Sequence, residues 1–557
     1  MNQGRKKGIA FLPIALIIIL GFAIYFNTLS GKFIWDDHHL IKDNLYIKSW
    51  SYLPHLFTRH IGHGGFTKYN SYRPIQMVTY MVNHSLSGLD VRWYHFTNIL
   101  LHVLVALAIY WLVNILYDDR LLSLITSLLF VSHPIHVAAV AYISGRADSL
   151  ALFFMILSFI FYIKTLDTKR KGAYILMLLS FMLALLSREN VLIFPALLLL
   201  YHYAARKRFN IYRFMPLLSI AFAYMLLRGT FLKSTLPHLS AHTGFLQRLP
   251  GFFVAITNYI RLIFFPLDQH MEYGNRFFNI TDPRAISGVV ILFLLLTYAF
   301  RKRDSNRLVF FSVCWFFIAL LPLSNLYPIP IAYMAEHWLY VPSIGFCLIL
   351  AKGLSRLYGT KTLKTLAIAF VTLIVGFYSF LTIRYNEYWR EPMVFYTRNL
   401  EYVPDSVRTL SYIAVEYYNM GKKEEAIASL KKAIRLNPDD AKAYNNLGRI
   451  YGDLGRYGEA ISSYKKAIEL DPDLIVVYSN LGVAYVATGE TKKARASFEE
   501  AINLDPGFAG GYYNLAILYY KEKRYDLAIK YCNEAIKRGY KVDPDFLNSL
   551  KSYDKDE

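Results

Sequence analysis

Residues 441–472 read AKAYNNLGRIYGDLGRYGEAISSYKKAIELDP, and this stretch decides the fold of the C-terminal part of the chain. Large residues such as Tyr444, Leu447 and Tyr464 surround the small residues Gly448 and Ala460. Prolines recur every 34 residues, at Pro404, Pro438, Pro472 and Pro506. A period of this length predicts a stack of helical hairpins, in which each hairpin buries its apolar face against its neighbours.

The spacing matches the tetratricopeptide repeat (TPR). Counting from residue 405, we expect four repeats that end at residue 540, followed by a charged tail over 541–557. The first repeat is degenerate, and the last has Tyr540 in place of its closing proline. Such an array is typically a scaffold for binding peptides and does not by itself indicate any chemistry.

The composition of the whole chain is that of a polytopic membrane protein. Of its 557 residues, 55% are hydrophobic and only 18% are charged. The net charge of +21 could suggest a nucleic acid partner. Most of the basic residues, however, lie in short loops between apolar runs, which indicates membrane orientation and no nucleic acid. Cys314, Cys347 and Cys532 lie far apart and indicate neither a disulfide framework nor a metal site.

Apolar runs predict about eleven membrane-spanning helices. The first is an uncleaved N-terminal segment of about 20 apolar residues behind a basic start. The others lie near residues 96–117, 121–138, 148–165, 172–187, 190–205, 212–231, 285–300, 308–327, 338–352 and 363–383.

The distribution of Lys and Arg predicts the orientation of these spans. Arg5, Lys6 and Lys7 place the N-terminus in the cytoplasm, and alternate loops on that side are basic. The segment 245–266 is apolar enough to span, but a crossing there would invert every later loop. We therefore expect it to be an interfacial or re-entrant helix on the outer face. The chain then leaves the membrane after residue 383 on the outer face, which is periplasmic or extracellular in a prokaryote and luminal in a eukaryote.

Four polar clusters fall on that outer face. The first is FIWDDHHLIKDN (33–44), with the adjacent carboxylates Asp36 and Asp37, and the others are 133–148, SREN (187–190) and AEHWLY (335–340). Ionisable groups at membrane depth cost about 2.5–3.5 kcal/mol each on insertion scales, so their clustering indicates a functional site. The alternative is that each cluster consists of ordinary interfacial loop residues.

The order of these motifs resembles the transmembrane and TPR-containing family of protein O-mannosyltransferases, which are GT-C glycosyltransferases. The similar stretches are YRPIQMVTYMVN (72–83), HFTNILLH (95–102), HPIHVAAVAYISGRADSLALFF (133–154) and AEHWLYVPSIGFCLIL (335–350), besides Asp36-Asp37 and the repeats. The resemblance implies an all-α fold in which a GT-C-type core of about eleven transmembrane helices precedes a TPR α-solenoid. The domains would be the core (1–390, with the outer loop 28–95), a linker (391–404), four repeats (405–540) and the tail (541–557).

The family's activity implies a polyprenyl- or dolichyl-phosphate sugar as donor, with mannose or a related hexose, and a Ser/Thr hydroxyl of an exported protein as acceptor. An inverting transfer needs one carboxylate that accepts the hydroxyl proton. By this resemblance Asp36 is that base and Asp37 positions the acceptor. Adjacent residues on an extended strand point in opposite directions, so the two carboxylates need not share a task.

The departing lipid phosphate needs cationic or hydrogen-bonding partners. Arg146 is the first candidate, because a guanidinium matches phosphate oxygens. Alternatively, Arg146 and Asp148 form an ion pair at a helix start. Further candidates for the phosphate are His133, His136 and Arg188, and weaker site candidates are Asp148, Glu189, Glu336, Arg73 and His102.

A divalent cation, Mg²⁺ or Mn²⁺, would be compatible with this chemistry. The sequence fixes no ligand set for it, so we predict no dedicated metal site. Two other functions remain open. One is a membrane-anchored TPR scaffold for assembling an envelope or surface complex. The other is a transporter or flippase of a lipid-linked sugar, although transporters usually place their charged site near the membrane midplane.

Overall fold

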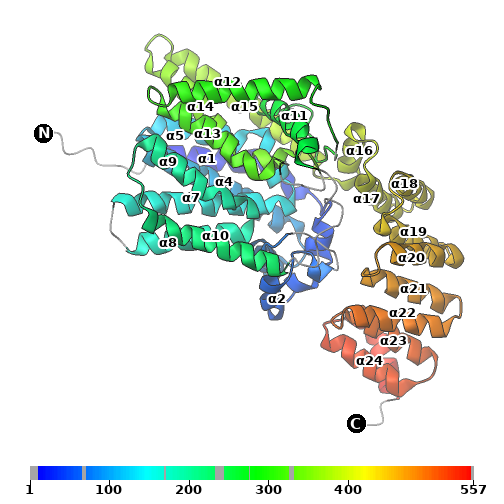
Figure 1. Cartoon of the computed structure of the whole chain (residues 1–557). Coiled ribbons are helices and arrows are strands. Elements are labelled where there is room, and N and C mark those ends of the chain that lie inside the picture. Colours follow the sequence, from blue (N-terminus) through cyan, green and yellow to red (C-terminus); the bar gives the residue numbers. More distant parts are fainter. Residues whose placement is uncertain are drawn as a thin grey trace. The chain divides into compact units, whose positions relative to one another are not determined.

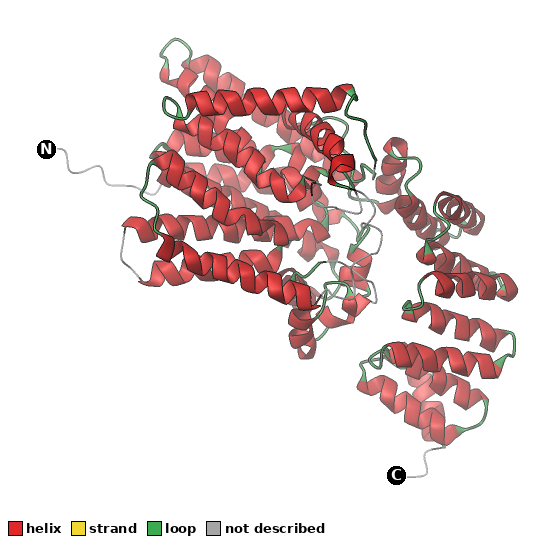
Figure 2. Cartoon of the chain, in the orientation of Figure 1, coloured by secondary structure: helices red, strands yellow, loops and turns green. Residues whose placement is uncertain are grey.

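The computed structural model describes residues 11–65, 71–167, 171–231, 244–274, 276–324, 326 and 332–553. These residues form helices and no strand, and they separate into two compact units, 1–403 and 404–557 (Figure 2). The predicted all-α fold is therefore observed for the described part of the chain. The basic residues Arg5, Lys6 and Lys7 lie outside it.

The first unit is a bundle of apolar helices (Figure 1). Its helices are α1 (Phe11–Tyr25), α2 (Leu53–Thr58), α3 (Pro74–Ser87), α4 (Val91–Tyr117), α5 (Arg120–Ser132), α6 (Val137–Val140), α7 (Arg146–Asp167), α8 (Lys171–Ser187), α9 (Phe194–Ala205), α10 (Ile211–Phe231), α11 (Phe245–Phe264), α12 (Pro283–Lys302), α13 (Arg307–Leu320), α14 (Ser343–Gly359), α15 (Lys364–Tyr388) and α16 (Pro392–Tyr402).

Helix ends follow ordinary capping chemistry, and the junction of α4 and α5 is an example. Asp118 ends α4 in the left-handed conformation, with φ of 48°. The side chain of Asp119 then accepts a hydrogen bond from the backbone N of Leu122, 2.9 Å away, at the start of α5. Two adjacent aspartates therefore stop one helix and cap the next, which allows a tight reversal between two buried helices.

Six helices of the described residues are long and apolar enough to cross a membrane, so the chain is an integral membrane protein. They are Phe11–Ser30, Val91–Tyr117, Ile143–Leu166, Ile211–Phe231, Pro283–Lys302 and Lys364–Tyr388. A seventh would be the pair Arg120–Ser132 and Pro134–Val140, which is bent by 54°. The prediction of about eleven spans is thus not confirmed, because the helices at 171–187, 189–205 and 307–323 are apolar but shorter.

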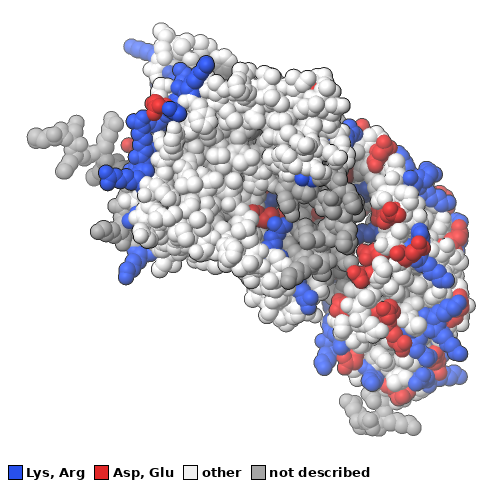
Figure 3. All heavy atoms as spheres, viewed as in Figure 1, with Lys and Arg blue, Asp and Glu red and all other residues white. Residues whose placement is uncertain are grey.

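The surface of the first unit fits a membrane environment. On the face that Figure 3 shows, a broad area has almost no charged side chains, and Lys and Arg gather at the end nearest the N-terminus. A band without charges bordered by basic residues is typical of a bilayer-spanning bundle.

The second unit is a TPR array of four helical hairpins and a terminal helix. Its helices are α17 (Val407–Asn419), α18 (Lys423–Leu436), α19 (Ala441–Asp453), α20 (Tyr457–Leu470), α21 (Ile475–Ala487), α22 (Thr491–Leu504), α23 (Ala509–Lys521), α24 (Tyr525–Lys537) and α25 (Pro544–Lys551). A Cβ on Gly448 would lie 2.7 Å from the ring of Tyr464, so this glycine allows α19 and α20 to pack closely.

Two segments differ from the expected domain boundaries. Residues 391–404, which we expected to be a linker, contain α16, and this helix lies within the first unit. Residues 541–557, expected to be a charged tail, contain α25, whose Leu550 is buried with the repeats. In both segments apolar residues spaced along a helix outweigh the polar composition.

Candidate active site

The Asp36-Asp37 motif lies in a tight turn and not on the extended strand we expected. Trp35 has φ of 59°, in the left-handed region, and the π-helix His38–Lys42 follows the turn. A left-handed conformation costs a residue with a side chain roughly 1–2 kcal/mol. Packing holds it here, because the buried Trp35 ring contacts Phe395 and Tyr396 with centroids 5.5 and 5.9 Å away. The turn is therefore anchored on α16.

Asp37 points into the protein. Its carboxylate accepts hydrogen bonds from the backbone N of Ile34 (3.1 Å), the backbone N of Ser144 (2.9 Å) and the hydroxyl of Ser144. Only 1% of the residue is exposed. Burial raises the pKa of Asp37 to about 7, and the three donors lower it only in part. Asp37 therefore joins the 33–37 turn to the 143–146 segment.

Ser144 belongs to a larger buried network, which we call the clamped cluster: Asp37, Gln76, Tyr80, Asn98, Ser144 and Arg146. Gln76 donates to the backbone O of Ser144 at 3.0 Å. Asn98 donates to three backbone oxygens of the 140–143 segment, at 3.0–3.3 Å. The bent segment between α5 and α7 thus receives from side chains the hydrogen bonds that its irregular backbone lacks.

Arg146 is fully buried within this cluster. Its guanidinium donates to the side chains of Asn98 (2.7 Å), Asn83 (2.6 Å) and Thr79 (3.1 Å), and to the backbone O of Tyr94 (2.9 Å). It also lies over the ring of Tyr80, 4.7 Å from the centroid. Protein groups therefore occupy most of the donors that a phosphate would require.

Asp36 differs from its neighbour. The residue is partly exposed, and its backbone N donates to the hydroxyl of Tyr142 at 3.2 Å. The Tyr142 ring in turn stacks on Trp389, with centroids 5.4 Å apart. Of the two adjacent carboxylates, Asp37 is buried among three donors, whereas Asp36 lies nearer the surface in a turn fixed by aromatic packing.

Four other predicted residues form two ion pairs. Arg73 and Glu189 make a bidentate pair, with N···O distances of 3.0 and 2.8 Å. Asp148 pairs with Arg188. The alternative of an ion pair between Arg146 and Asp148 is therefore wrong, because Asp148 pairs with an arginine 40 residues further along the chain. The two arginines lie close enough for their charges to repel each other.

The predicted histidines lie in the core, with both ring nitrogens engaged. His102 contacts the hydroxyl of Tyr340 (2.7 Å) and the backbone O of Val131 (3.2 Å). His136 contacts the backbone O of Phe130 (2.8 Å) and the hydroxyl of Ser343 (2.9 Å). The His136 ring neighbours the other two, with its centroid 5.5 Å from that of His102 and 5.8 Å from that of His133.

His133 contacts the backbone O of Ile263 at 2.9 Å and accepts from the backbone N of Ile135 at 3.2 Å. It thereby links α11 to the bend after α5. The structure brings these histidines together but places them in helix packing, and their predicted role at a phosphate stays a prediction.

Glu336 lies in a separate small pocket. Its Oε1 accepts from the hydroxyl of Tyr273 (2.6 Å) and the backbone N of His270 (2.7 Å). Burial raises the pKa of Glu336 to about 7. The pocket is lined by Gln269, His270, Met271, Glu336, Tyr385, Tyr388, Trp389, Phe395, Arg398 and Asn399.

Sequence reasoning missed most residues around these sites. Gln76 and Asn98 stand among apolar neighbours, and a buried amide in an apolar helix is the signal that could have identified them. The polar run DQHMEY (268–273) was not among the predicted site segments, and residues 391–400 were expected to belong to a linker. Their proximity in space depends on the bundle and has no local signature.

No group of three or more His, Cys, Asp or Glu side chains arranged to hold a metal occurs among the described residues. The divalent cation considered above stays a prediction.

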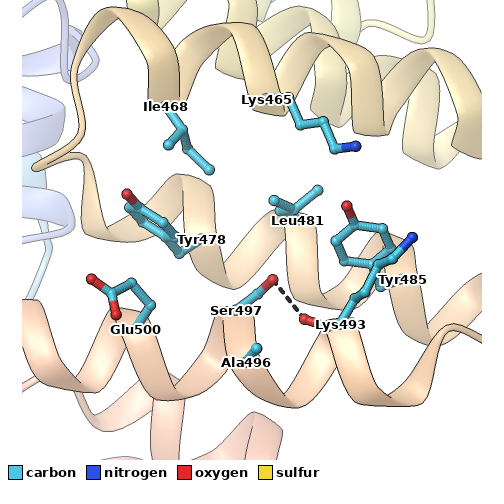
Figure 4. Close-up of a pocket in the computed structure, with 9 residues that line it drawn as sticks. All are labelled: Lys465, Ile468, Tyr478, Leu481, Tyr485, Lys493, Ala496, Ser497 and Glu500. Carbon is cyan, nitrogen blue, oxygen red and sulfur yellow. Dashed lines mark hydrogen bonds between the residues drawn. The ribbon is translucent and has the colours of Figure 1, made fainter.

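The second unit carries an open groove of about 390 Å³ between α20, α21 and α22 (Figure 4). It is lined by Lys465, Ile468, Tyr478, Leu481, Tyr485, Lys493, Ala496, Ser497 and Glu500. In Figure 4, Lys465 and Lys493 reach toward one end of the groove and Glu500 lies at the other.

Together, the fold and these sites define a polytopic membrane protein with a C-terminal TPR array. The family profile "TPR repeat" matches residues 415–455 and 448–489, and "Tetratricopeptide repeat" matches 479–543. The predicted repeats are therefore confirmed over 415–543.

The curated relatives of the chain are protein O-mannosyl-transferases. The chain is 27% identical over 439 residues to protein O-mannosyl-transferase F38B6.6 of Caenorhabditis elegans, which covers 76% of this chain and 61% of that protein. It is 26% identical over 500 residues to protein O-mannosyl-transferase TMTC1 of Homo sapiens, and the match covers 78% of this chain and 56% of that protein. Over a shorter region of 159 residues it is 38% identical to protein O-mannosyl-transferase TMTC2 of Homo sapiens, and this match covers 28% of this chain and 19% of that protein. The chain thus spans between about half and three-fifths of the first two relatives.

Proposed function

We propose that this protein is a membrane glycosyltransferase that moves a hexose from a polyprenyl- or dolichyl-phosphate donor to a Ser or Thr hydroxyl of a protein. The names of its relatives support the reaction class. The observation that carries the proposal is the turn at Trp35, which holds one carboxylate in the interior and leaves the adjacent one partly exposed.

Asp36 acts as the general base in this proposal. It accepts the proton of the acceptor hydroxyl while that oxygen attacks the anomeric carbon from the face opposite the phosphate, and the C–O bond to the phosphate breaks. The configuration at the anomeric carbon is inverted. A positioned base of this kind contributes about 10²–10⁴-fold to a rate. Asp37 acts indirectly, because its bonds to Ser144 and Ile34 fix the turn.

Arg73 and Arg188 are our candidates for the departing phosphate. They are close together. Arg73 is partly exposed, with 16% of its side chain accessible, whereas Arg188 is buried, with 8% accessible. Arginine binds phosphate oxygens in a bidentate manner, and each would exchange part of its bond to Glu189 or Asp148 for the leaving group. Arg146 supports the structure of the site in this proposal, because its donors already have protein partners.

We also propose that the chain crosses the membrane about eleven times, with α11 on the surface and with Asp36 and the TPR array on the outer side. A helix is observed at each predicted span. In this arrangement the TPR groove can hold an acceptor protein on the side where the reaction occurs.

The test is sugar transfer by purified protein in detergent, from radiolabelled polyprenyl-phosphate mannose, glucose and galactose to a Ser/Thr-rich acceptor. Wild type is expected to transfer from at least one donor, and Asp36→Asn to lose this activity. The matched control is Asp43→Asn, which removes an exposed carboxylate from the same segment and is expected to keep activity. Equal activity of Asp36→Asn and wild type would reject Asp36 as the base. Absence of transfer by folded wild type with every donor would reject the transferase.

A further inference from the structure

The Glu336 pocket has an arrangement that the proposed chemistry at Asp36 does not use. Its floor is the segment 269–271, and three side chains fix this backbone. Arg398 donates to the backbone O of Gln269 (2.9 Å), Glu336 accepts from the N of His270 (2.7 Å), and Asn399 Oδ1 accepts from the N of Met271 (3.0 Å). Successive residues of a loop are thus held in one conformation by groups from η11 (Glu336–Leu339) and α16.

Two hydrogen-bond donors in this rigid pocket have no partner among the described residues. They are Nε2 of Gln269 and Nδ2 of Asn399. The two residues are only 5% and 1% exposed. The bond from Met271 fixes the orientation of the Asn399 amide, because it requires an oxygen at Oδ1. A buried donor without a partner destabilises the fold, so a rigid site that retains two of them is suited to an acceptor from a ligand.

The size of the pocket restricts what can reach these donors. Its volume is about 20 Å³, which is close to the space that one water-sized oxygen needs. A hydroxyl group has two acceptor lone pairs and one donor. The amides of Gln269 and Asn399 supply two donors, and the carboxylate of Glu336 supplies an acceptor. The number and type of partners therefore match one hydroxyl.

Aromatic rings surround this polar centre. Trp389, Phe395, Tyr385 and Tyr388 line the pocket, and Arg398 lies over the Tyr388 ring, 3.9 Å from its centroid. Trp389, Phe395 and Tyr385 are buried, so these rings form an apolar wall around the polar centre.

The same rings connect the pocket to the Asp36 turn. Trp389 stacks on Tyr142, whose hydroxyl accepts from the backbone N of Asp36, and Phe395 contacts Trp35. The pocket is therefore one layer of aromatic side chains away from the turn that carries the base.

We propose that Gln269, Glu336 and Asn399 form a subsite that recognises one hydroxyl group of the donor sugar. This inference rests on the proposed function, because it assigns specificity to the same transfer. It adds two residues, Gln269 and Asn399, that determine which hexose is used and take no part in proton transfer.

The experiment pairs changes in the protein with changes in the sugar. Gln269→Met removes the donor amide and keeps the shape of the side chain. Asn399→Asp keeps Oδ1 for Met271 and replaces the donor by an oxygen. Gln247→Met, at an exposed glutamine of α11, is the matched control. The substrates are the polyprenyl-phosphate hexose that wild type uses best and each of its monodeoxy analogues.

Wild type is expected to use one monodeoxy analogue with kcat/KM about tenfold or more below the parent, as for other sites built to bind a hydroxyl. In Gln269→Met and Asn399→Asp, kcat/KM for the parent donor should fall to the value for that analogue. The value for the analogue itself should change little. Gln247→Met should keep the wild-type preference. If Gln269 and Asn399 had a purely structural role, their substitution would lower kcat/KM for the parent donor and for the analogue by the same factor. An equal ratio of kcat/KM for parent and analogue in wild type and both variants would overturn the proposal. The pocket would then be a site for a resident water only.

Equilibrium binding separates this inference from the transferase assignment. The dissociation constants of the parent and analogue donors are measured without acceptor, first for the Asp36→Asn variant and then for the double variant Asp36→Asn/Gln269→Met. Loss of the preference on adding Gln269→Met supports the subsite even if no transfer is found. An unchanged preference overturns the subsite even if wild type is an active transferase. A preference for the parent donor that appears in transfer but not in donor binding would assign the pocket to the acceptor hydroxyl. That result would also overturn the proposal.

Discussion

The clamped cluster around Arg146 and the Glu336 pocket both belong to the first unit and are both buried and polar, yet they differ in how their hydrogen-bond donors are paired. The clamped cluster has an acceptor without a partner among the described residues, Oε1 of Gln76, but its donors are paired. In the clamped cluster the guanidinium of Arg146 has four protein acceptors and the carboxylate of Asp37 has three donors. In the pocket, two amide donors have no partner among the described residues. Paired groups stabilise one structure, whereas unpaired groups in a rigid site are available for a ligand.

The largest effect expected from this comparison concerns Arg146. Arg146→Met would leave the side-chain oxygens of Asn83 and Asn98 buried without this donor, so the free energy of unfolding should fall by about 3 kcal/mol or more. Thermal unfolding in detergent measures this effect. The control, Arg92→Met at an exposed ion pair, should change little. Normal stability of Arg146→Met together with a raised KM for the donor would instead make Arg146 the phosphate ligand.

The second prediction concerns pH. The pKa of Asp37 is raised from an ordinary 3.8 to about 7 in the folded protein, so the folded state binds the proton more tightly than the unfolded state. The contribution of this group to stability is then fully present below about pH 4 and is lost as the pH rises to about 7. Asp37→Asn removes this dependence.

The pKa of Glu336 is also raised, so this residue makes stability depend on pH in the same direction. It is present in both proteins, so the difference in stability between wild type and Asp37→Asn reports on Asp37 alone. Unfolding midpoints measured from pH 4 to 8 should show wild type losing stability relative to the variant as the pH rises. Asp43→Asn should follow wild type. A constant difference across this range would show that Asp37 does not titrate there.

A smaller effect on stability is expected in the pocket. Gln269→Met removes an amide donor that has no partner within the described part of the chain, so the free energy of unfolding should change by less than about 1 kcal/mol. The same thermal unfolding assay measures it. A loss as large as that of Arg146→Met would mean that the pocket is as structural as the clamped cluster.

The smallest effect is expected in the TPR groove. Lys465→Glu with Lys493→Glu reverses the charge at one end of the groove, and charges at the rim of an interface mainly affect association rates. Transfer to a folded acceptor protein should fall a few-fold, while hydrolysis of the donor should be unchanged. Equal loss of both activities would separate the groove from acceptor binding.

Much of the fold could be predicted from the sequence, because the signals are periodic or extended. The 34-residue spacing predicted the repeats, and each apolar run became a helix. The eleven spans were harder, since α8, α9 and α13 are short and only their packing in the bundle decides how they meet a membrane.

The site could be predicted only in part. Asp36 and Asp37 were identified as a pair, but their different surroundings depend on Trp35, whose left-handed conformation has no sequence signal in a residue other than glycine or asparagine. The partner of Asp148 lies 40 residues away, and Gln269, Glu336 and Asn399 come from three distant segments. Such contacts follow from tertiary packing and not from local pattern.

The most direct test of the account compares Asp36→Asn with Asp37→Asn in sugar transfer and thermal unfolding on the same preparations. We expect Asp36→Asn to lose transfer with an unchanged unfolding midpoint, whereas Asp37→Asn should lose stability along with activity. Full transfer by Asp36→Asn, or a loss of its transfer that merely parallels unfolding, would contradict the assignment of Asp36 as the base.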